Sequence, residues 1–185
     1  HLIAEQVSMS YIYSLHQLLQ MILGFAERLG LVGRNNAKVA GNVKKSKGKV
    51  DFWTLEEFTT FIQTFDTKHV NERLMFTVYW FLFFTGLRIG ELQALTWKDI
   101  NFNEKWVYIH KSIYYRNRKN WEFTDPKTQS SIRKLYLDDD TLKHLKEWKE
   151  VQRQIGKINF IFSDNGLPIV KNRVNKMLIR HAEKV

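Results

Sequence analysis

An arginine that directly follows a glycine turn is the clearest candidate for phosphate chemistry in this chain. Residues 85–92 read Thr-Gly-Leu-Arg-Ile-Gly-Glu-Leu, so Arg88 stands where a hydrophobic segment turns into a new helix. Gly86 allows the tight turn, and a guanidinium on a rigid base can hold two oxygens of one phosphate. Glu91 could hydrogen-bond its neighbours or pair with Arg88. Taken alone, the segment favours an ordinary ion pair at a helix start, worth ~0.3–0.5 kcal/mol.

Helices on both sides of this turn must position it. Residues 71–85 are apolar enough for a buried helix that ends at Gly86, and residues 88–95 predict a short helix after it. Upstream, Thr54 and Glu57 match a capping box, followed by a helix with one apolar face.

Beyond residue 105 the chain changes to strand-like segments rich in β-branched and aromatic residues. The expected elements are strands at 106–109, 112–116, 132–137 and 160–162, a turn at 125–128 (Asp-Pro-Lys-Thr), and helices after Asp138 and at 171–182. The expected fold class is therefore mainly α with a small antiparallel β-sheet (α+β).

The N-terminal part has a different character. Residues 8–30 show helical spacing of apolar residues, with Ser8 or Ser10 to cap the start and Gly30 to end the helix. Residues 34–50 contain arginine and lysine among glycine and asparagine, and no acidic residue. This composition predicts a flexible, positively charged linker. We favour a strand that crosses a phosphate backbone over a merely solvated loop.

The composition limits the class of protein. Hydrophobic residues make up 44%, with 13 Phe, 7 Tyr and 6 Trp, which argues against intrinsic disorder. The net charge of +10 favours a polyanionic partner, nucleic acid before an acidic membrane, although a merely soluble basic protein also fits. The absence of cysteine excludes disulfides and thiol catalysis and fits a reducing cytoplasm. The apolar run at 74–87 is shorter than the ~20 residues of a membrane span.

Two segments together resemble the catalytic boxes of the tyrosine recombinase (phage integrase) family. Residues 85–100 are similar to the first box, Thr-Gly-Leu-Arg-x-x-Glu-Leu followed by Leu-x-Trp-x-Asp-Ile. Residues 125–133 resemble the Pro-Lys-Thr-x-x-Ser-x-Arg hairpin, and residues 52–57 the usual opening of the catalytic domain. The resemblance covers roughly residues 8–180, in order and with ordinary spacing.

The resemblance implies a role for each matched residue. Arg88 would clamp the scissile phosphate and its transition state, where fixed donors stabilise the developing charge. Lys127 would protonate the departing 5′-oxygen, a task that a lysine on a turn can perform, although most turn lysines are only solvated. Glu91 would support the site. The residues expected to contact DNA are Lys44, Lys45, Lys47, Lys49 and Arg133.

The third box of the family, His-x-Leu-Arg-His, has no match. Arg180 and His181 resemble its end, but Met177 stands where the leading histidine belongs. None of the seven tyrosines matches the nucleophile, because all of them precede the place of this box. We therefore expect a fragment that stops before the nucleophile and is inactive alone. The implied chemistry needs no metal and no cofactor.

The expected organisation is the end of a helical core-binding domain (1–33), a basic linker (34–50) and the first part of a catalytic domain (51–185). The chain opens at His1 rather than Met, so we expect it to start within a longer protein. The parent protein would recombine double-stranded DNA at attachment sites as a tetramer in the bacterial cytoplasm, the fragment alone being a monomer. Two alternatives stay open: a non-catalytic DNA-binding regulator with this fold, and an RNA-binding or membrane-surface basic domain, which the two ordered boxes disfavour.

Overall fold

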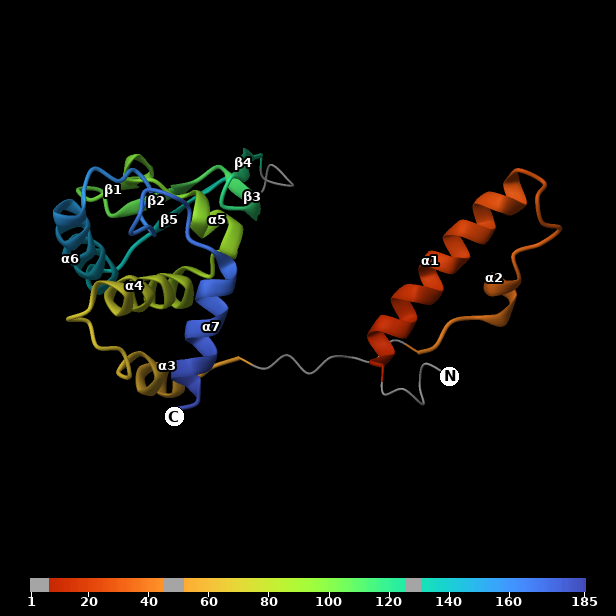
Figure 1. Cartoon of the computed structure of the whole chain (residues 1–185), viewed down its shortest axis with the longest axis horizontal. Coiled ribbons are helices and arrows are strands. Elements are labelled where there is room, and N and C mark those ends of the chain that lie inside the picture. The colour runs from red at the N-terminus through yellow and green to blue at the C-terminus, as the bar shows by residue number, and fades with distance from the viewer. Residues whose placement is uncertain (1–6, 45–51, 126–130) are drawn as a thin grey trace. The chain divides into compact units, whose positions relative to one another are not determined.

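The computed structural model describes residues 7–44, 52–125 and 131–185. The chain divides into two compact units, His1–Phe52 and Trp53–Val185 (Figure 1). Four of the lysines expected at the functional site lie outside the described residues, namely Lys45, Lys47, Lys49 and Lys127.

The first unit is built on one long helix, α1 (Met9–Arg28). Its N-cap is Ser8, whose Oγ accepts a hydrogen bond from the backbone N–H of Tyr11. Gly30 follows the end of the helix with a φ of 70°, which a glycine adopts without strain. The predicted helix and both of its end signals are confirmed, with Ser8 rather than Ser10 as the cap.

The first half of the expected linker is ordered, which corrects the prediction of a flexible segment. A short helix, α2 (Asn36–Ala40), packs against α1. Asn35 anchors it, because its side chain accepts from Lys38 N at 3.0 Å and donates to the carbonyl of Gln20 in α1 at 2.8 Å. Glu27 also accepts from the backbone N–H of Asn35 at 3.1 Å. These hydrogen bonds, together with the buried Ala37, hold residues 35–40 in place.

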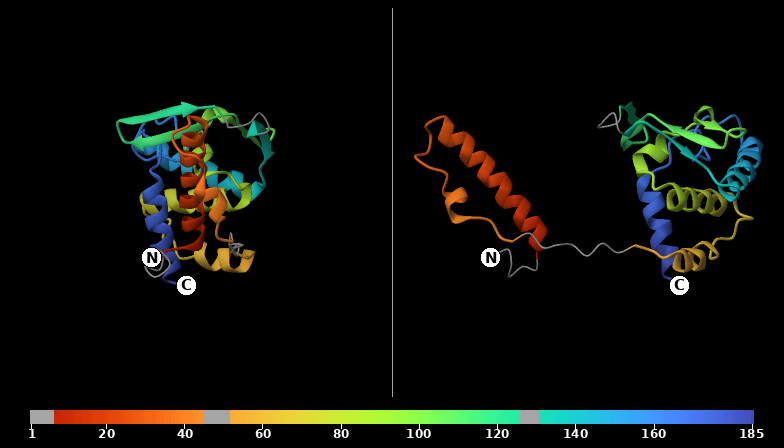
Figure 2. Two further views of the ribbon diagram at one scale, coloured as in Figure 1. Left: turned by 90° about the vertical axis from the view of Figure 1, so that its right-hand side faces the viewer. Right: turned by 180° about the vertical axis from the view of Figure 1, so that it is seen from behind.

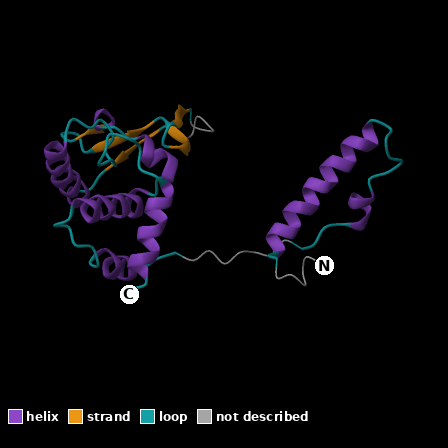
Figure 3. Cartoon of the chain, in the orientation of Figure 1, coloured by secondary structure: helices purple, strands orange, loops and turns teal. Residues whose placement is uncertain are grey.

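The second unit gathers its strands on one side and helices α3, α4 and α7 on the other (Figures 1 and 3). Its helices are α3 (Leu55–Ile62), α4 (Val70–Thr85), α5 (Ile89–Ala94), the 3₁₀ helix η1 (Trp97–Asp99), α6 (Asp139–Ile155) and α7 (Lys171–Ala182). Its strands are β1 (Ile100–Asn101), β2 (Trp106–Ile109), β3 (Ser112–Asn117), β4 (Asn120–Thr124) and β5 (Arg133–Tyr136).

Helix α4 runs through the core of this unit, and the view from behind shows the same arrangement (Figure 2). Leu74, Val78 and Phe81 are fully buried, and α6 packs beside the helix through the buried Trp148. The predicted capping box of α3 is present, with both the Thr54 and the Glu57 hydrogen bonds. Within the described residues, no helix is long and apolar enough to cross a bilayer.

The fold class is confirmed as helical with small antiparallel sheets, and the strands form two sheets rather than one. The first sheet has the order β1-β2-β5, while β3 pairs with β4 in a separate hairpin. The sequence did not indicate β4, because its residues read as part of the turn region. Residues 160–162 were expected to form a strand, but only an isolated bridge joins Phe160 to Thr96.

Candidate active site around Arg88

The turn that presents Arg88 is built as the sequence predicts. Helix α4 ends at Gly86, whose φ of 62° and ψ of 23° are left-handed, and its N–H donates to the carbonyl of Leu82 at 3.0 Å. Such a conformation suits glycine, which has no Cβ to clash. Leu87 is buried, and Arg88 follows in an extended conformation as the N-cap of α5. The backbone of Arg88 is thus fixed between two helices and a buried leucine.

Glu91 ties Arg88 to the helix that it precedes. One carboxylate oxygen, Oε2, accepts from the backbone N–H of Arg88 at 3.0 Å. The other, Oε1, accepts from the Arg88 guanidinium at 3.1 Å. The Glu91 side chain is only 7% exposed, whereas the Arg88 side chain is 76% exposed. A buried anion therefore holds a guanidinium that stays open to solvent.

A second arginine, Arg133 at the start of β5, completes the cluster. Its Nη2 donates to Glu91 Oε2 at 3.0 Å, and its Nη1 lies 3.4 Å from Oε1. The same Nη1 donates to the carbonyl of Ser131 at 3.0 Å. Glu91 thus joins α5 to the first residues of β5, which are 42 positions away in the sequence. The sequence offered no signal for this pairing. Arg133 was expected only to contact DNA.

The two arginines keep Glu91 ionised. Burial raises the pKa of the Glu91 carboxyl, but the hydrogen bonds and charges of Arg133 and Arg88 outweigh burial and hold the pKa below its ordinary value. The cluster contains two cations and one anion, so it keeps one net positive charge, and the exposed group that carries it is Arg88. A fixed, exposed guanidinium of this kind can bind an anion with little reorganisation.

The remaining site predictions fall in different places. Lys44 is exposed in the first unit. Tyr79 is buried, and its hydroxyl donates to the carbonyl of Val174 at 2.5 Å. Burial, with the charge of Glu72, raises the pKa of this phenol, so Tyr79 is poorly suited as a nucleophile. Among residues 7–44, 52–125 and 131–185, no group of three His, Asp or Glu side chains could hold a metal ion.

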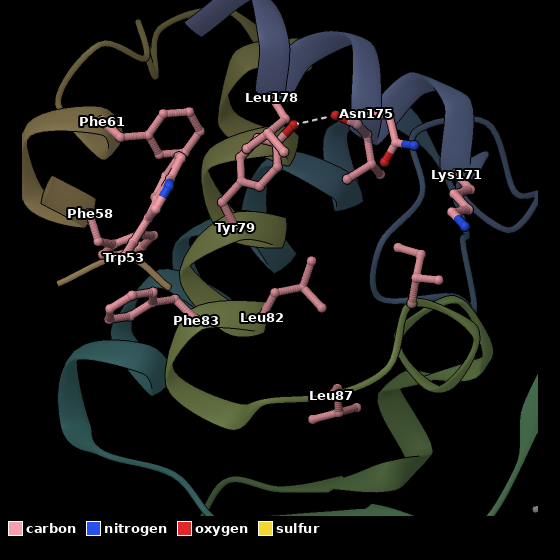
Figure 4. A pocket seen from close by; sticks show the side chains of 12 residues that line it. Trp53, Phe58, Phe61, Tyr79, Leu82, Phe83, Leu87, Lys171, Asn175 and Leu178 are labelled. Carbon is pink, nitrogen blue, oxygen red and sulfur yellow. Dashed lines mark hydrogen bonds between the residues drawn. The ribbon is translucent and has the colours of Figure 1, made fainter. Parts of the chain in front are cut away.

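An apolar pocket lies beside this turn, between α3, α4 and α7 (Figure 4). Trp53, Phe61 and Leu82 line it, and Leu87 reaches it from the segment before Arg88. Lys171 is the cation among its lining residues, and the pocket offers no carboxylate or histidine. Its composition suits apolar packing rather than chemistry.

Comparison with known proteins identifies the family. The model of the phage integrase family matches residues 51–185. The chain belongs to this family. The ICEBs1 integrase of Bacillus subtilis (strain 168) is 32% identical over 156 residues, which is 84% of this chain and 41% of that protein. The prophage integrase IntR of Escherichia coli (strain K12) is 26% identical over 130 residues, 70% of this chain and 29% of that protein. This phage integrase chain thus spans less than half the length of either relative.

Solved structures show the same fold. The Tn1549 transposon integrase in complex with transposon right end DNA matches with a TM-score of 0.80 at 19% identity, covering 99% of this chain and 60% of that chain. A lambda integrase dimer bound to a COC′ core site matches with a TM-score of 0.70 at 17% identity, covering 98% and 47%. The resemblance to tyrosine recombinases, and the catalytic-domain fold that it implied, are therefore confirmed.

Proposed function

We propose that the protein containing this chain is a site-specific DNA recombinase that breaks and rejoins strands through a 3′-phosphotyrosyl intermediate. In this proposal Arg88 clamps the scissile phosphate, and Lys127 protonates the departing 5′-oxygen. The observation that carries the proposal is the combination at Arg88 of an exposed guanidinium and a buried, ionised anchor.

The geometry suits the transition state of phosphoryl transfer. Negative charge builds up on the non-bridging oxygens of the phosphate as the nucleophile attacks, and donors fixed in advance stabilise that charge most. Glu91 anchors Arg88 and is itself paired with Arg133, while the Arg88 side chain stays open to solvent. Arg133 has both of its terminal nitrogens engaged with Glu91 and Ser131, which favours a positioning role over the expected DNA contact.

The nucleophilic tyrosine belongs, in this proposal, to a part of the protein beyond residue 185. The support is that the chain spans 41% of the ICEBs1 integrase and 60% of the Tn1549 integrase chain. The burial of Tyr79 is consistent with it. The 185-residue chain alone would then bind duplex DNA without cutting it.

DNA is the proposed partner, and residues 34–50 are the proposed contact with its backbone. The chain has a net charge of +10, and Lys44 at the described end of this segment is exposed. We assign residues 1–33 to the end of a core-binding domain and residues 51–185 to the catalytic domain. The full protein would act as a tetramer on two duplexes in the bacterial cytoplasm; a lambda integrase tetramer bound to a Holliday junction has the same fold.

A suicide substrate tests the proposed reaction. The full-length protein should form a covalent adduct with a nicked attachment site, and the 185-residue chain should bind the same DNA and form none. An adduct on any tyrosine of the 185-residue chain would overturn the assignment of the nucleophile. A full-length protein that binds the site but never forms an adduct would favour the non-catalytic regulator instead.

The salt dependence of DNA binding tests the basic segment. Changing Lys44, Lys45, Lys47 and Lys49 to alanine should flatten the plot of log affinity against log salt by ~0.9 for each phosphate that is no longer neutralised. A matched variant removes the same charge from exposed lysines scattered over the second unit, namely Lys68, Lys98, Lys143 and Lys157. If both variants change the slope equally, or neither does, the segment is not the principal contact.

A further inference from the structure

A small cavity lies between the turn of the β3–β4 hairpin and the loop that leads into α7, and no residue of the Arg88 cluster lines it. Its volume is about 40 Å³, which exceeds the ~10–15 Å³ that one water molecule needs. The lining includes the buried Ser163 and Ile169, and also Arg118 in the hairpin turn, which is exposed. The cavity can therefore take a small ligand from solvent.

Two donors at this cavity lack an acceptor in the part of the chain that the structure describes. The hydroxyl of Tyr115, on β3, lines the cavity and is buried without a hydrogen-bond partner among those residues. The guanidinium of Arg118 forms no ion pair or hydrogen bond within residues 7–44, 52–125 and 131–185. A buried donor without an acceptor destabilises a fold. A ligand that accepts hydrogen bonds would remove this cost.

Acceptors beside the cavity already have donors. Both carboxylate oxygens of Asp164 accept from the guanidinium of Arg173, one at 3.0 Å and the other at 2.5 Å. The backbone carbonyl of Ser163 accepts from the side chain of Gln152 at 2.6 Å. A ligand in the cavity would thus meet donors that need an acceptor more than acceptors that need a donor.

The charges at the cavity also favour an anion. Hydrogen bonds and charge from Arg173, with the charge of Arg118, hold the pKa of the Asp164 carboxyl below its ordinary value, although burial opposes them. Asp164 is therefore ionised and is neutralised by its partner Arg173. Arg118 keeps an unpaired positive charge, as Arg88 does in its own cluster.

We infer that this cavity binds a small oxyanion of the phosphate type, held by the Arg118 guanidinium and the Tyr115 hydroxyl. A guanidinium offers two parallel donors to an oxyanion, and bonds to a charged oxygen are the strong ones. The ligand would join the turn of the β3–β4 hairpin to the loop before α7. Free inorganic phosphate and a phosphate group of DNA share this chemistry. The inference goes beyond the proposed function and does not depend on it.

Titration of the 185-residue chain with inorganic phosphate tests the site, with the phosphorus NMR line width as the readout at constant ionic strength. Binding should saturate at one phosphate per chain. Tyr115→Phe removes only the hydroxyl and should weaken the affinity roughly 10-fold, because a hydrogen bond to a charged group is lost. Arg118→Ala should weaken it by about 10–100-fold.

Arg116 provides a matched control, because it is an exposed arginine on the same hairpin and does not line the cavity. Arg116→Ala should bind phosphate like the parent. If it weakens binding as much as Arg118→Ala, the phosphate is attracted only by the general positive charge, and the inference is wrong. The inference also fails if Tyr115→Phe, with an unchanged thermal midpoint, binds phosphate as tightly as the parent.

A short DNA duplex distinguishes the two sources of the phosphate. If the duplex displaces bound phosphate, and Tyr115→Phe weakens duplex binding, the site holds a phosphate of the DNA backbone. If the duplex binds without displacing phosphate, the site holds the free ion. Either result supports the cavity as an oxyanion site. Absence of saturable phosphate binding, together with unchanged duplex binding by Tyr115→Phe, would overturn it and leave the proposed recombinase untouched.

Discussion

Among the buried ionisable groups of the second unit, Glu91 on α5 and His181 on α7 have different surroundings. Both have exposed fractions below one tenth, and both contact charged or polar partners. The partners of Glu91 lead outward, because one of them, Arg88, is 76% exposed. The polar contacts of Glu91 thus reach an exposed side chain, and those of His181 lie mainly within the unit.

Most partners of His181 are enclosed, and the Nζ of one exposed residue, Lys184, lies 3.3 Å from its Nδ1. Its ring stacks on Phe65 with 3.7 Å between centroids, and its Nδ1 lies 2.7 Å from Thr64 Oγ1. Its Nε2 lies 3.2 Å from a carboxylate oxygen of Glu72, which is largely buried. These contacts tie the end of α7 to the segment that follows α3 and to α4. In the sequence, Arg180-His181 stood apart from the third catalytic box and a helix was expected there, and His181 lies on α7.

The comparison separates a buried carboxylate that fixes an exposed guanidinium from a buried ring whose shortest contacts join segments of the core. Substitutions should then separate activity from stability. We expect Arg88 to affect activity alone, His181 stability alone, and Glu91 both.

The largest expected effect belongs to Arg88. In the full-length protein, Arg88→Ala should lower the rate of strand cleavage by about 10²–10³-fold or more, because a fixed donor to the transition state is removed. The affinity for the site should stay within a few-fold of the parent's, and the thermal midpoint should not change. Arg88→Lys should also be poor, since an ammonium cannot reproduce the two-pronged contact.

Arg153 provides a matched control for Arg88. It is 64% exposed and pairs with Glu150, also three residues away on a helix. Arg153→Ala should leave cleavage unchanged. If Arg88→Ala instead unfolds the second unit, the ordinary ion pair at a helix start becomes the better interpretation.

The next effect belongs to Glu91. Glu91→Gln removes the charge that both arginines share, so the free energy of unfolding of the 185-residue chain should fall by about 1–3 kcal/mol. Cleavage by the full-length protein should also slow, by on the order of 10-fold, because Arg88 loses its anchor. Urea unfolding and single-turnover cleavage measure the two effects. Glu150→Gln, which alters an exposed pair, is the control and should change neither.

The smallest effect concerns His181 and pH. Burial lowers the pKa of His181, even though Glu72 opposes the shift. The unfolded chain then binds the extra proton first, so stability is complete above about pH 6.5 and declines as the pH falls below that value. The contribution of one such group is at most about 1.4 kcal/mol per pH unit.

His181→Phe should therefore flatten the dependence of the thermal midpoint on pH between about 5 and 7, with cleavage at neutral pH unchanged in the full-length protein. Some slope should remain, because burial also lowers the pKa of His144. His69→Gln, at an exposed histidine, is the control. An unchanged slope in His181→Phe would show that the buried ring does not govern acid stability.

Local chemistry explains which elements the sequence predicted. The Thr54 capping box, the left-handed Gly86 and the bounds 171–182 of the last helix depend on residues within one or two turns of each other. The sequence also predicted strand 106–109 with the bounds that the structure has, because its residues are apolar and aromatic and favour a strand. These elements include the turn that presents Arg88.

Long-range contacts explain what the sequence did not predict. The pairing of Arg133 with Glu91 joins residues 42 positions apart and depends on where β5 enters the sheet. The close approach of Gly90 to Ser112 depends on how α5 packs on the hairpin. Helix α2 forms because Asn35 reaches the backbone of α1, and the charge pattern of residues 34–50 gave no sign of it. Family resemblance supplied the candidate residues, and only the tertiary structure supplied their neighbours.

The most direct test of the central claim uses a site whose scissile phosphate is replaced by an uncharged methylphosphonate. If Arg88 serves to neutralise charge on a non-bridging oxygen, removing that oxygen should remove most of the need for it. The rate of adduct formation by full-length Arg88→Ala, relative to the parent, should then rise by at least 10-fold over the ratio on an ordinary phosphate, with Glu91→Gln showing a smaller rise. Equal ratios on the two substrates for Arg88→Ala would contradict the claim that this guanidinium acts on the phosphate.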